Sequence, residues 1–327
     1  MSQELSAKIA GLLHMLRETP VVKLSDERMR IFAKLEGNNP VGSVKDRPAL
    51  WILHNAAMRG ELDEGTTVIE SSSGNFASAV AFYAHFLGID FVPVIDPNIS
   101  SSYEAFLRQL CGNVVKVTER DNTGGFLATR LQKVKELCQT TENSFWPNQH
   151  GNHDAIDAHY RFTGEEICSQ FDELDYVFIG VSTGGTIAGV SQRVKEKFPN
   201  VRVVAVDAEG SVIFGGPSKK RNIPGIGASM RSKLVDQALI DDVVIVSEIE
   251  TVRACQTLLM KHGLFVGGSS GSCYAAIERL APSICCSRKP PTVLFLCADR
   301  GAAYANTIYN AAWAMTLEPA HHTGRYQ

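Results

Sequence analysis

The sequence lacks any long run of apolar residues, and no segment approaches the roughly 20 residues that a membrane-spanning helix needs. It also lacks an excess of charge of one sign, because 32 Lys and Arg are balanced by 35 Asp and Glu to give a net charge of −3. Residues 1–16 have no basic region before a long apolar stretch and are expected to form an amphipathic helix instead of a signal peptide. We therefore expect a cytoplasmic protein without a membrane or nucleic-acid partner.

Metal-binding and triad motifs are also missing. None of the eight cysteines forms a C-x-x-C pair, and no Cys/His spacing suits zinc. The nine histidines include no H-E-x-x-H motif, and no Ser/His/Asp triad can be assembled. We expect no metal, and cysteines that are reduced and mostly buried.

What the sequence does contain is a regular alternation of short apolar strands with helices. This pattern predicts βαβ units and parallel sheets, which is an α/β fold. The chain holds two such series, and they meet at the polar, turn-rich segment 146–156. We expect a smaller α/β domain over residues 36–152 and a larger one formed by 1–35 and 153–327. The predicted strands lie at 66–71, 90–97, 113–118, 175–182, 201–208, 241–247 and 292–299.

Three loops that follow strands and open helices are candidate ligand sites, because ligands of open parallel sheets bind beyond the carboxyl ends of the strands. They read "SSSGNFAS" (71–78), "GVSTGGTIAG" (180–189) and "VGGSSGSCYAA" (266–276). The first could be a plain serine cap and the third a cap over a tight turn. The second is neither a Walker A motif nor G-x-G-x-x-G, but its glycines and hydroxyls favour a phosphate cup at a helix start.

A fourth segment holds a lysine in an unusual setting. In "EGNNPVGSVKDRPALWIL" (36–53), Lys45 lies in a turn rich in Asn, Pro and Gly at the start of an apolar-periodic segment. A lysine on a helix is usually solvated, whereas this one is placed where its reach is fixed.

The four segments, in this order, resemble those of the fold-type-II pyridoxal-phosphate enzymes, the group of cysteine synthase and cystathionine β-synthase. The similarity extends from Glu18 to Gly301. It implies two domains with twisted, mostly parallel sheets flanked by helices, as in tryptophan synthase β, and pyridoxal 5'-phosphate as cofactor. It also implies a homodimer.

The resemblance assigns roles to the residues that hold the cofactor. Lys45 would form the Schiff base and then act as the general base. Asn75 matches the asparagine that binds the ring hydroxyl, and Ser269 the serine at the pyridine nitrogen, with Ser270 as the alternative. A neutral hydroxyl there would favour β-elimination. The phosphate loop would be Ser182, Thr183, Gly184, Gly185 and Thr186, where Ser182 replaces the usual glycine.

Other matched residues would bind the substrate. Ser72, Ser73 and Gln149 correspond to the group that holds the α-carboxylate. The dianionic leaving group would need a cation, and Arg231, or else Arg221, lies in the basic loop 215–232. Met230 stands where related sequences tend to place an arginine.

The segments "VDAEGSVIFGG" (206–216), "IPGIGAS" (223–229) and "ADRG" (298–301) resemble a narrower branch. The family's usual "P-S-x-G-E-R-Y" is replaced here by "CADRGAAY". The branch implies a β-replacement (EC 2.5.1 type) in siderophore and amino-acid biosynthesis. O-phospho-L-serine, through an aminoacrylate, would join L-glutamate to give N-(2-amino-2-carboxyethyl)-L-glutamate and phosphate, a step towards 2,3-diaminopropionate for staphyloferrin B.

Two alternatives remain open. A cysteine synthase would use O-acetylserine or O-phosphoserine with sulfide as the nucleophile. A cofactor-free homologue would act as a binding or regulatory module, but the intact Lys45 and Asn75 argue against this interpretation.

Overall fold

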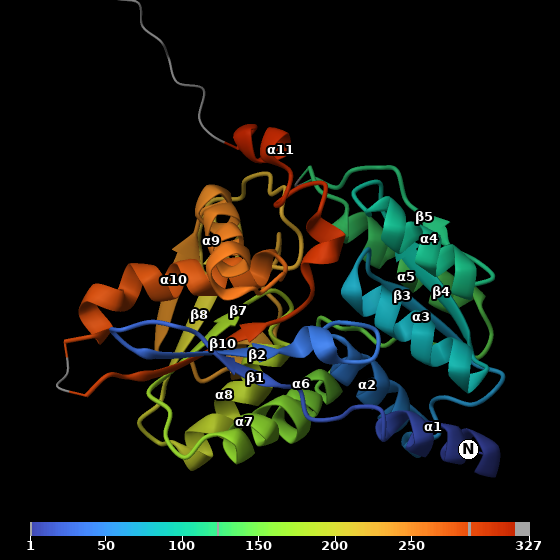
Figure 1. Cartoon of the computed structure of the whole chain (residues 1–327). Helices are drawn as coiled ribbons and strands as arrows, with labels where there is room; N and C mark the ends of the chain where they lie inside the picture. Colours follow the sequence, from blue (N-terminus) through green and yellow to red (C-terminus); the bar gives the residue numbers. More distant parts are fainter. Residues whose placement is uncertain (1, 123, 287–288, 318–327) are drawn as a thin grey trace, which may run out of the picture.

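The chain folds into two α/β units, each built on its own sheet (Figure 1). The computed structural model describes residues 2–122, 124–286 and 289–317. The larger sheet has the order β1-β2-β10-β7-β8-β9 and the smaller one β5-β4-β3-β6. The strands are β1 (Val21–Lys23), β2 (Arg30–Leu35), β3 (Thr67–Ser71), β4 (Asp90–Ile95), β5 (Val115–Lys116), β6 (Ser144–Phe145), β7 (Tyr176–Gly180), β8 (Arg202–Ala208), β9 (Asp242–Val246) and β10 (Thr292–Cys297).

Nearly all strand pairs are parallel, and the expected fold class is confirmed. The antiparallel pair is β1 with β2, at the edge of the larger sheet. All the other pairs are parallel, including β10 between β2 and β7. Strands β1, β2 and β6 were not predicted from the sequence, whereas the predicted strands contain the remaining seven.

The larger sheet is covered by helices on both faces. Along β7, Phe178 packs into one core with α9 and α10, while Val177 and Ile179 pack into a second core with α7 and α8. Figure 1 shows α9 and α10 above this sheet and α7 and α8 below it. This two-sided burial explains why the strands read as continuous apolar runs. The helices are α6 (Asp154–Ala158), α7 (Glu165–Gln170), α8 (Gly185–Lys197), α9 (Glu248–His262), α10 (Gly268–Ile284) and α11 (Ala311–Met315).

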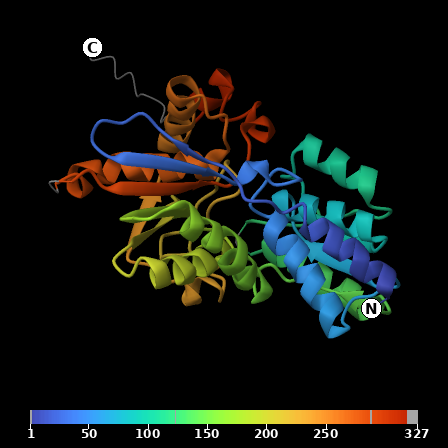
Figure 2. The same ribbon diagram turned by 60° about the horizontal axis from the view of Figure 1, so that its bottom comes forward.

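The smaller sheet has its own cores. Helices α1, α2 and α3 share one of them, and α5 packs on β3 and β4 through Val134, Ile69 and Val94. Figure 2 shows α1 beside α2, away from β1 and β2. The limits of the two domains stay a prediction. The helices of this unit are α1 (Gln3–Leu13), α2 (Asp46–Arg59), α3 (Asn75–Leu87), α4 (Ser101–Leu110) and α5 (Leu127–Thr140).

A helix with an irregular middle joins the units. It runs through α6, a π-helical stretch (His159–Gly164) and α7. Helix α8 packs so closely against this helix that a Cβ on Gly189 would lie 2.2 Å from the carbonyl oxygen of Ile156. Glycine at position 189 permits this approach. Short 3₁₀ turns, Glu36–Asn38, Val235–Gln237 and Gly301–Tyr304, complete the described structure.

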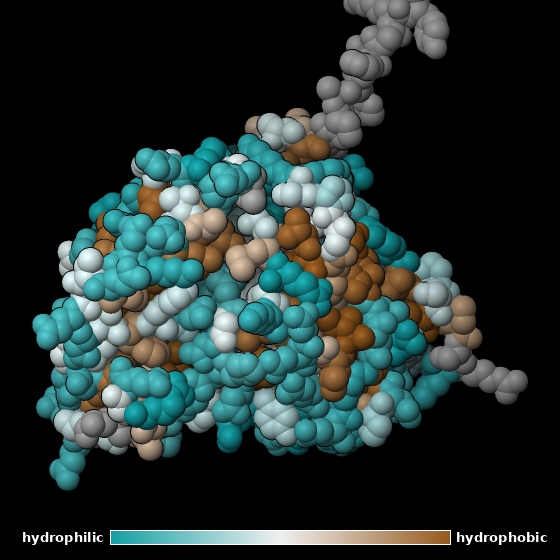
Figure 3. Space-filling view, turned by 180° about the vertical axis from the view of Figure 1, so that it is seen from behind, coloured by the Kyte–Doolittle hydropathy of each residue, from teal (hydrophilic) through white to brown (hydrophobic). Residues whose placement is uncertain are grey.

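On the face that Figure 3 shows, hydrophilic residues cover most of the area, and apolar residues gather in a band to the right of the centre. The exposed large apolar side chains include Val243 and Ile245 of the edge strand β9. Among the described residues, no helix has the length and apolar character required to span a bilayer.

Candidate active site

Lys45 precedes α2 and is held by the loop before it. The carboxylate of Asp46 accepts hydrogen bonds from the backbone N–H groups of Val41 (2.7 Å) and Ser43 (3.1 Å) and from the Tyr83 hydroxyl (2.9 Å). Ser43 also forms an antiparallel bridge to Asp299, beyond β10. The turn that the sequence places around Lys45 is therefore fixed from both units.

A buried ionic cluster anchors the first turn of α2. Arg47 donates to Glu36 (2.7 Å) and to Glu166 of α7 (2.6 Å), and Glu166 also pairs with Lys34 at 2.8 Å. Arg47, Glu36 and Lys34 are fully buried. Burial alone would raise the pKa of Glu36, but Arg47 and Lys34 lower it to about 2. The cluster therefore stays charged and ties α2 to β2 and α7.

The amine of Lys45 has an altered acidity. Burial lowers its pKa to about 8, and the negative charge of Asp299 only partly opposes this shift. A substantial fraction of this amine is therefore neutral near physiological pH, as a nucleophile or general base requires.

The glycine-rich loop forms the expected strand–loop–helix unit between β7 and α8. Gly184 has a φ of +93°, and a Cβ there would lie 2.6 Å from Val235, so only glycine fits. The first N–H groups of α8 have no partner within the helix, which suits an anion. The Ser182 hydroxyl donates to the carbonyl of Gly227 at 3.2 Å, so the added hydroxyl ties this loop to segment 223–229.

A small cavity of about 10 Å³ brings Lys45, Gln149 and the phosphate loop together. His159, which the sequence did not single out, lines it as well. The His159 Nε2 atom lies 3.1 Å from the Thr186 hydroxyl, and its Nδ1 lies 3.0 Å from that of Thr163. Burial, with Lys45 nearby, lowers the pKa of His159 to about 3, so the ring is neutral. The cavity is lined by Lys45, Pro48, Phe76, Gln149, Ala155, His159, Thr183, Gly185 and Thr186.

The serine loop lies between β3 and α3. The Ser72 hydroxyl accepts a hydrogen bond at 3.2 Å from the backbone N–H of Ala77, in the first turn of α3, whose N-cap residue is Gly74. Ser73 bonds to Asp96 (3.1 Å) and Arg130 (3.2 Å). The amide of Gln149 donates to the carbonyl of Ser71 at 3.0 Å, so Gln149 contacts this loop, and its role in binding the α-carboxylate stays a prediction.

Beside Gln149 lies a buried carboxyl group that the sequence did not mark. Glu70 accepts the backbone N–H of Gln149 at 3.1 Å, and the indole of Trp146 lies 3.3 Å from it. Burial raises the pKa of Glu70 to about 7 against these hydrogen bonds. The carboxyl group therefore links the serine loop to the segment that carries Gln149.

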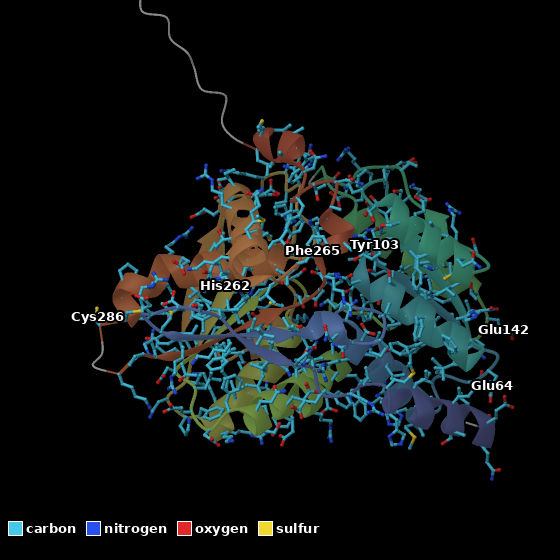
Figure 4. All side chains as sticks on the ribbon, viewed as in Figure 1. Glu64, Tyr103, Glu142, His262, Phe265 and Cys286 are labelled. Atoms are coloured by element: carbon cyan, nitrogen blue, oxygen red, sulfur yellow. The ribbon has the colours of Figure 1, made fainter. Side chains whose placement is uncertain are left out.

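Asn75 meets an acidic residue that the sequence marked only as part of an unusual segment. Its amide donates to Asp299 at 2.7 Å and accepts from the Tyr103 hydroxyl of α4. Tyr304 donates to the same Asp299 oxygen at 2.8 Å. Figure 4 shows Tyr103 at the junction of the two units. Burial raises the pKa of Asp299, while Asn75, Tyr304 and Lys45 act to lower it.

Ser269 and Ser270 open α10, next to the end of β7. A Cβ on Gly180 would lie 3.3 Å from the Cβ of Ser269, so Ser269 adjoins the start of the phosphate loop. Ser270 is fully buried, and its Oγ has no hydrogen-bond partner among the described residues. The choice of Ser269 stays a prediction.

The two predicted arginines do not line the small cavity beside Lys45. Arg231 is 42% exposed and pairs with Asp236 at 2.7 Å. Arg221 is half-buried, and it donates to the carbonyl of Ile226 at 3.4 Å. Their role in binding the leaving group stays a prediction.

Several buried oxygens suggest that this region holds a polar group. Ser71 Oγ, Ser270 Oγ and Asp299 Oδ1 have no hydrogen-bond partner among the described residues, and such atoms are rare in native proteins. A partly neutral amine, an anion-binding loop and an asparagine amide fit pyridoxal phosphate, which supplies an aldehyde and an electron-withdrawing ring when bound. No metal-like group of three His, Cys, Asp or Glu occurs in the described part of the chain.

Comparisons with known proteins agree with this geometry. The family model described as "Pyridoxal-phosphate dependent enzyme" matches residues 12–297. Two relatives are N-(2-amino-2-carboxyethyl)-L-glutamate synthases, from Ralstonia nicotianae and Cupriavidus metallidurans. Each is 39% identical to the chain; the alignments cover 90% and 93% of this chain and 88% and 90% of the relatives.

Solved structures give the same fold. The O-acetylserine-dependent cystathionine β-synthase of Helicobacter pylori has a TM-score of 0.83 and 29% identity, covering 90% of this chain and 97% of its own. An O-ureido-L-serine synthase has a TM-score of 0.83 and 28% identity, covering 92% and 95%.

Proposed function

The chain belongs to the pyridoxal-phosphate dependent enzyme family, and we propose that it joins O-phospho-L-serine to L-glutamate. The products are N-(2-amino-2-carboxyethyl)-L-glutamate and phosphate. The reaction is a β-replacement, and pyridoxal 5'-phosphate is the cofactor. The observation that carries the β-replacement is the meeting of Lys45, Gln149 and the phosphate loop at one cavity. The choice of substrates rests on the two synthases that are 39% identical over nearly the whole chain.

The residues of the site divide the work of this reaction. The N–H groups and hydroxyls of residues 182–186 would hold the cofactor's phosphate, and Asn75 and Ser269 would hold its ring. Ser72, Ser73 and Gln149 hold the donor's α-carboxylate. The freed amine of Lys45 takes the proton from Cα, phosphate leaves from Cβ, the glutamate nitrogen bonds to Cβ, and Lys45 returns a proton to Cα.

The acidity of Lys45 supports this role. A pKa of about 8 lets the amine accept a proton from Cα and give it back within one turnover near neutral pH. The neighbouring His159 is neutral and bonded to Thr186, so it orients the phosphate loop without adding charge.

Product identification tests the proposal. The purified holoenzyme is supplied with O-phosphoserine together with one acceptor in each reaction, which is glutamate, glutamine or sulfide. The products are identified by mass spectrometry. We expect the glutamate adduct and one equivalent of phosphate. Cysteine formed from sulfide, with no adduct from glutamate, would identify a cysteine synthase instead. Lys45→Ala, which should form neither product, is the control for uncatalysed addition.

The product indicates where the enzyme would act. N-(2-amino-2-carboxyethyl)-L-glutamate contains the carbon skeleton of 2,3-diaminopropionate, so a step that cleaves the glutamate part would release this siderophore precursor. We further propose a cytoplasmic homodimer, as is usual in the family.

A further inference from the structure

We propose that the cavity of about 240 Å³ beside Asn75 binds the acceptor amino acid, and that Arg300 binds the carboxylate of its side chain. This inference rests on the proposed function and extends it to the second substrate. The cavity lies between the loop Asn39–Ser43, which leads to Lys45, and the residues after β10. Its volume approaches the lower end of small-molecule sites, about 300 Å³.

Arg300 is held in place but forms no ion pair with another residue that the structure describes. Its backbone forms an antiparallel bridge to Val266, and its Nε–H donates to the carbonyl of Gly37 at 2.7 Å. A Cβ on Gly37 would lie 2.9 Å from the Arg300 Cγ, so glycine lets the side chain lie there. No carboxylate of the described chain forms an ion pair with Arg300, which is exposed. Its outer nitrogens are therefore available for a ligand's carboxylate.

The neighbouring residue supplies the opposite charge. Asp299 also lines the cavity and is only 4% exposed; its Oδ2 accepts hydrogen bonds from Asn75 and Tyr304, and its Oδ1 lies against Gly267. A buried carboxylate is costly unless a cation accompanies it. An amino acid with its ammonium group towards Asp299 and its side-chain carboxylate towards Arg300 matches this pair, whereas sulfide has neither group.

The position of the cavity suits a second substrate. Lys45 lines the small cavity together with the phosphate loop, and the charge of Asp299, which lines the larger cavity, acts on the Lys45 amine. The donor's α-carboxylate would occupy the serine loop. Figure 4 shows Tyr103 and Phe265 near the junction of the units, and Tyr103 lines the larger cavity. Asn75 lines the larger cavity, whereas no residue of the phosphate loop does.

The test compares two acceptors in Arg300→Gln. The holoenzyme is first mixed with O-phosphoserine alone, and the change in cofactor absorbance gives the rate of the donor half-reaction. Glutamate or glutamine is then added, and KM is measured for each. We expect an unchanged donor half-reaction, a KM for glutamate raised about ten- to a hundredfold, and a KM for glutamine changed little. Arg300→Lys should recover part of the preference for glutamate.

Arg17→Gln is the matched control, because Arg17 is an exposed arginine between α1 and β1; it should behave like wild type. If Arg300→Gln keeps the wild-type preference for glutamate, or slows the donor half-reaction as much as the acceptor step, the assigned site is wrong while the proposed function stands. If the wild-type enzyme accepts sulfide but no amine, the proposed function itself fails.

Discussion

At the scale of the residue, Lys45 and Lys34 show two settings for a lysine withdrawn from solvent: Lys34 is fully buried, whereas Lys45 is half-buried. Burial lowers the pKa of both. Lys34 has the carboxylate of Glu166 at 2.8 Å and the carbonyl of Thr19 at 3.1 Å, so its charge is matched by direct contacts. Lys45 has no ion pair with any described residue, and Asp299 acts on it only from a distance. The first arrangement is structural, whereas the second leaves an amine that can react.

This difference predicts that replacing Lys45 by an apolar residue stabilises the folded protein and abolishes its activity. Lys45→Met should abolish product formation, yet raise the free energy of unfolding of the cofactor-free protein by about 1–3 kcal/mol at pH 7. The folded pKa, about 8, lies below the unfolded value, so the folded state binds fewer protons between pH 8 and 10.5. The wild-type penalty is therefore complete below pH 8 and disappears as the pH rises to about 10.5.

Urea unfolding at pH 7 and pH 10 measures this difference. Lys261→Met, an exposed lysine near the end of α9, is the control and should be neutral at both pH values. A Lys45→Met protein that is less stable than wild type at pH 7 would show that the amine is not penalised by burial.

At the scale of the element, the sequence predicted the loops of the candidate site, but it did not predict the residues from other parts of the chain that contact the site. Glycines and hydroxyls between a strand and a helix mark residues 180–189 in the sequence alone, and β7 and α8 flank them as expected. His159 escaped prediction because its role comes from a π-helical turn, which a 3.6-residue periodicity does not reveal. Asp299 and Tyr103 reach Asn75 from distant parts of the chain, and no local pattern encodes such contacts.

A prediction about the phosphate loop distinguishes backbone strain at a positive φ from a steric clash of an added Cβ atom. Gly184→Ala should weaken cofactor binding at least tenfold, because the residue has φ +93° and its Cβ would lie 2.6 Å from Val235. Gly215→Ala is the matched control, since Gly215 has φ +87° but no other atom within 4 Å of an added Cβ. The control should lose about 1–2 kcal/mol of stability from backbone strain alone.

Titration with pyridoxal phosphate, followed by absorbance, measures the affinity, and thermal unfolding of the cofactor-free forms measures the strain. Equal affinities in the two variants would mean that the loop does not hold the phosphate.

At the scale of the whole molecule, the two sheets were predictable because their apolar runs are continuous, but the contacts between the units were not. Helix α2 belongs to the core of the smaller unit. In its first turn, however, Arg47 forms ion pairs with Glu36, which follows β2, and with Glu166 of α7, and both β2 and α7 belong to the larger unit. The Asn75–Asp299 bond also crosses between the units. Movement of one unit against the other must therefore change the geometry around Lys45.

We expect the smaller unit to close when a donor binds. The serine loop and the start of α3 offer N–H groups and hydroxyls on one side of the site, while the phosphate loop lies on the other. An α-carboxylate gives the N–H groups and hydroxyls of the serine loop a shared partner that differs between the open and closed states, so it favours the closed state. Crystal structures of the holoenzyme alone, with O-phosphoserine, and with O-phosphoethanolamine would reveal the movement of residues 71–75 relative to 182–186. O-Phosphoethanolamine carries the amine and the phosphate but no α-carboxylate, and should leave the protein open. Closure with both compounds would assign the trigger to the phosphate, and closure with neither would mean that the units are rigid.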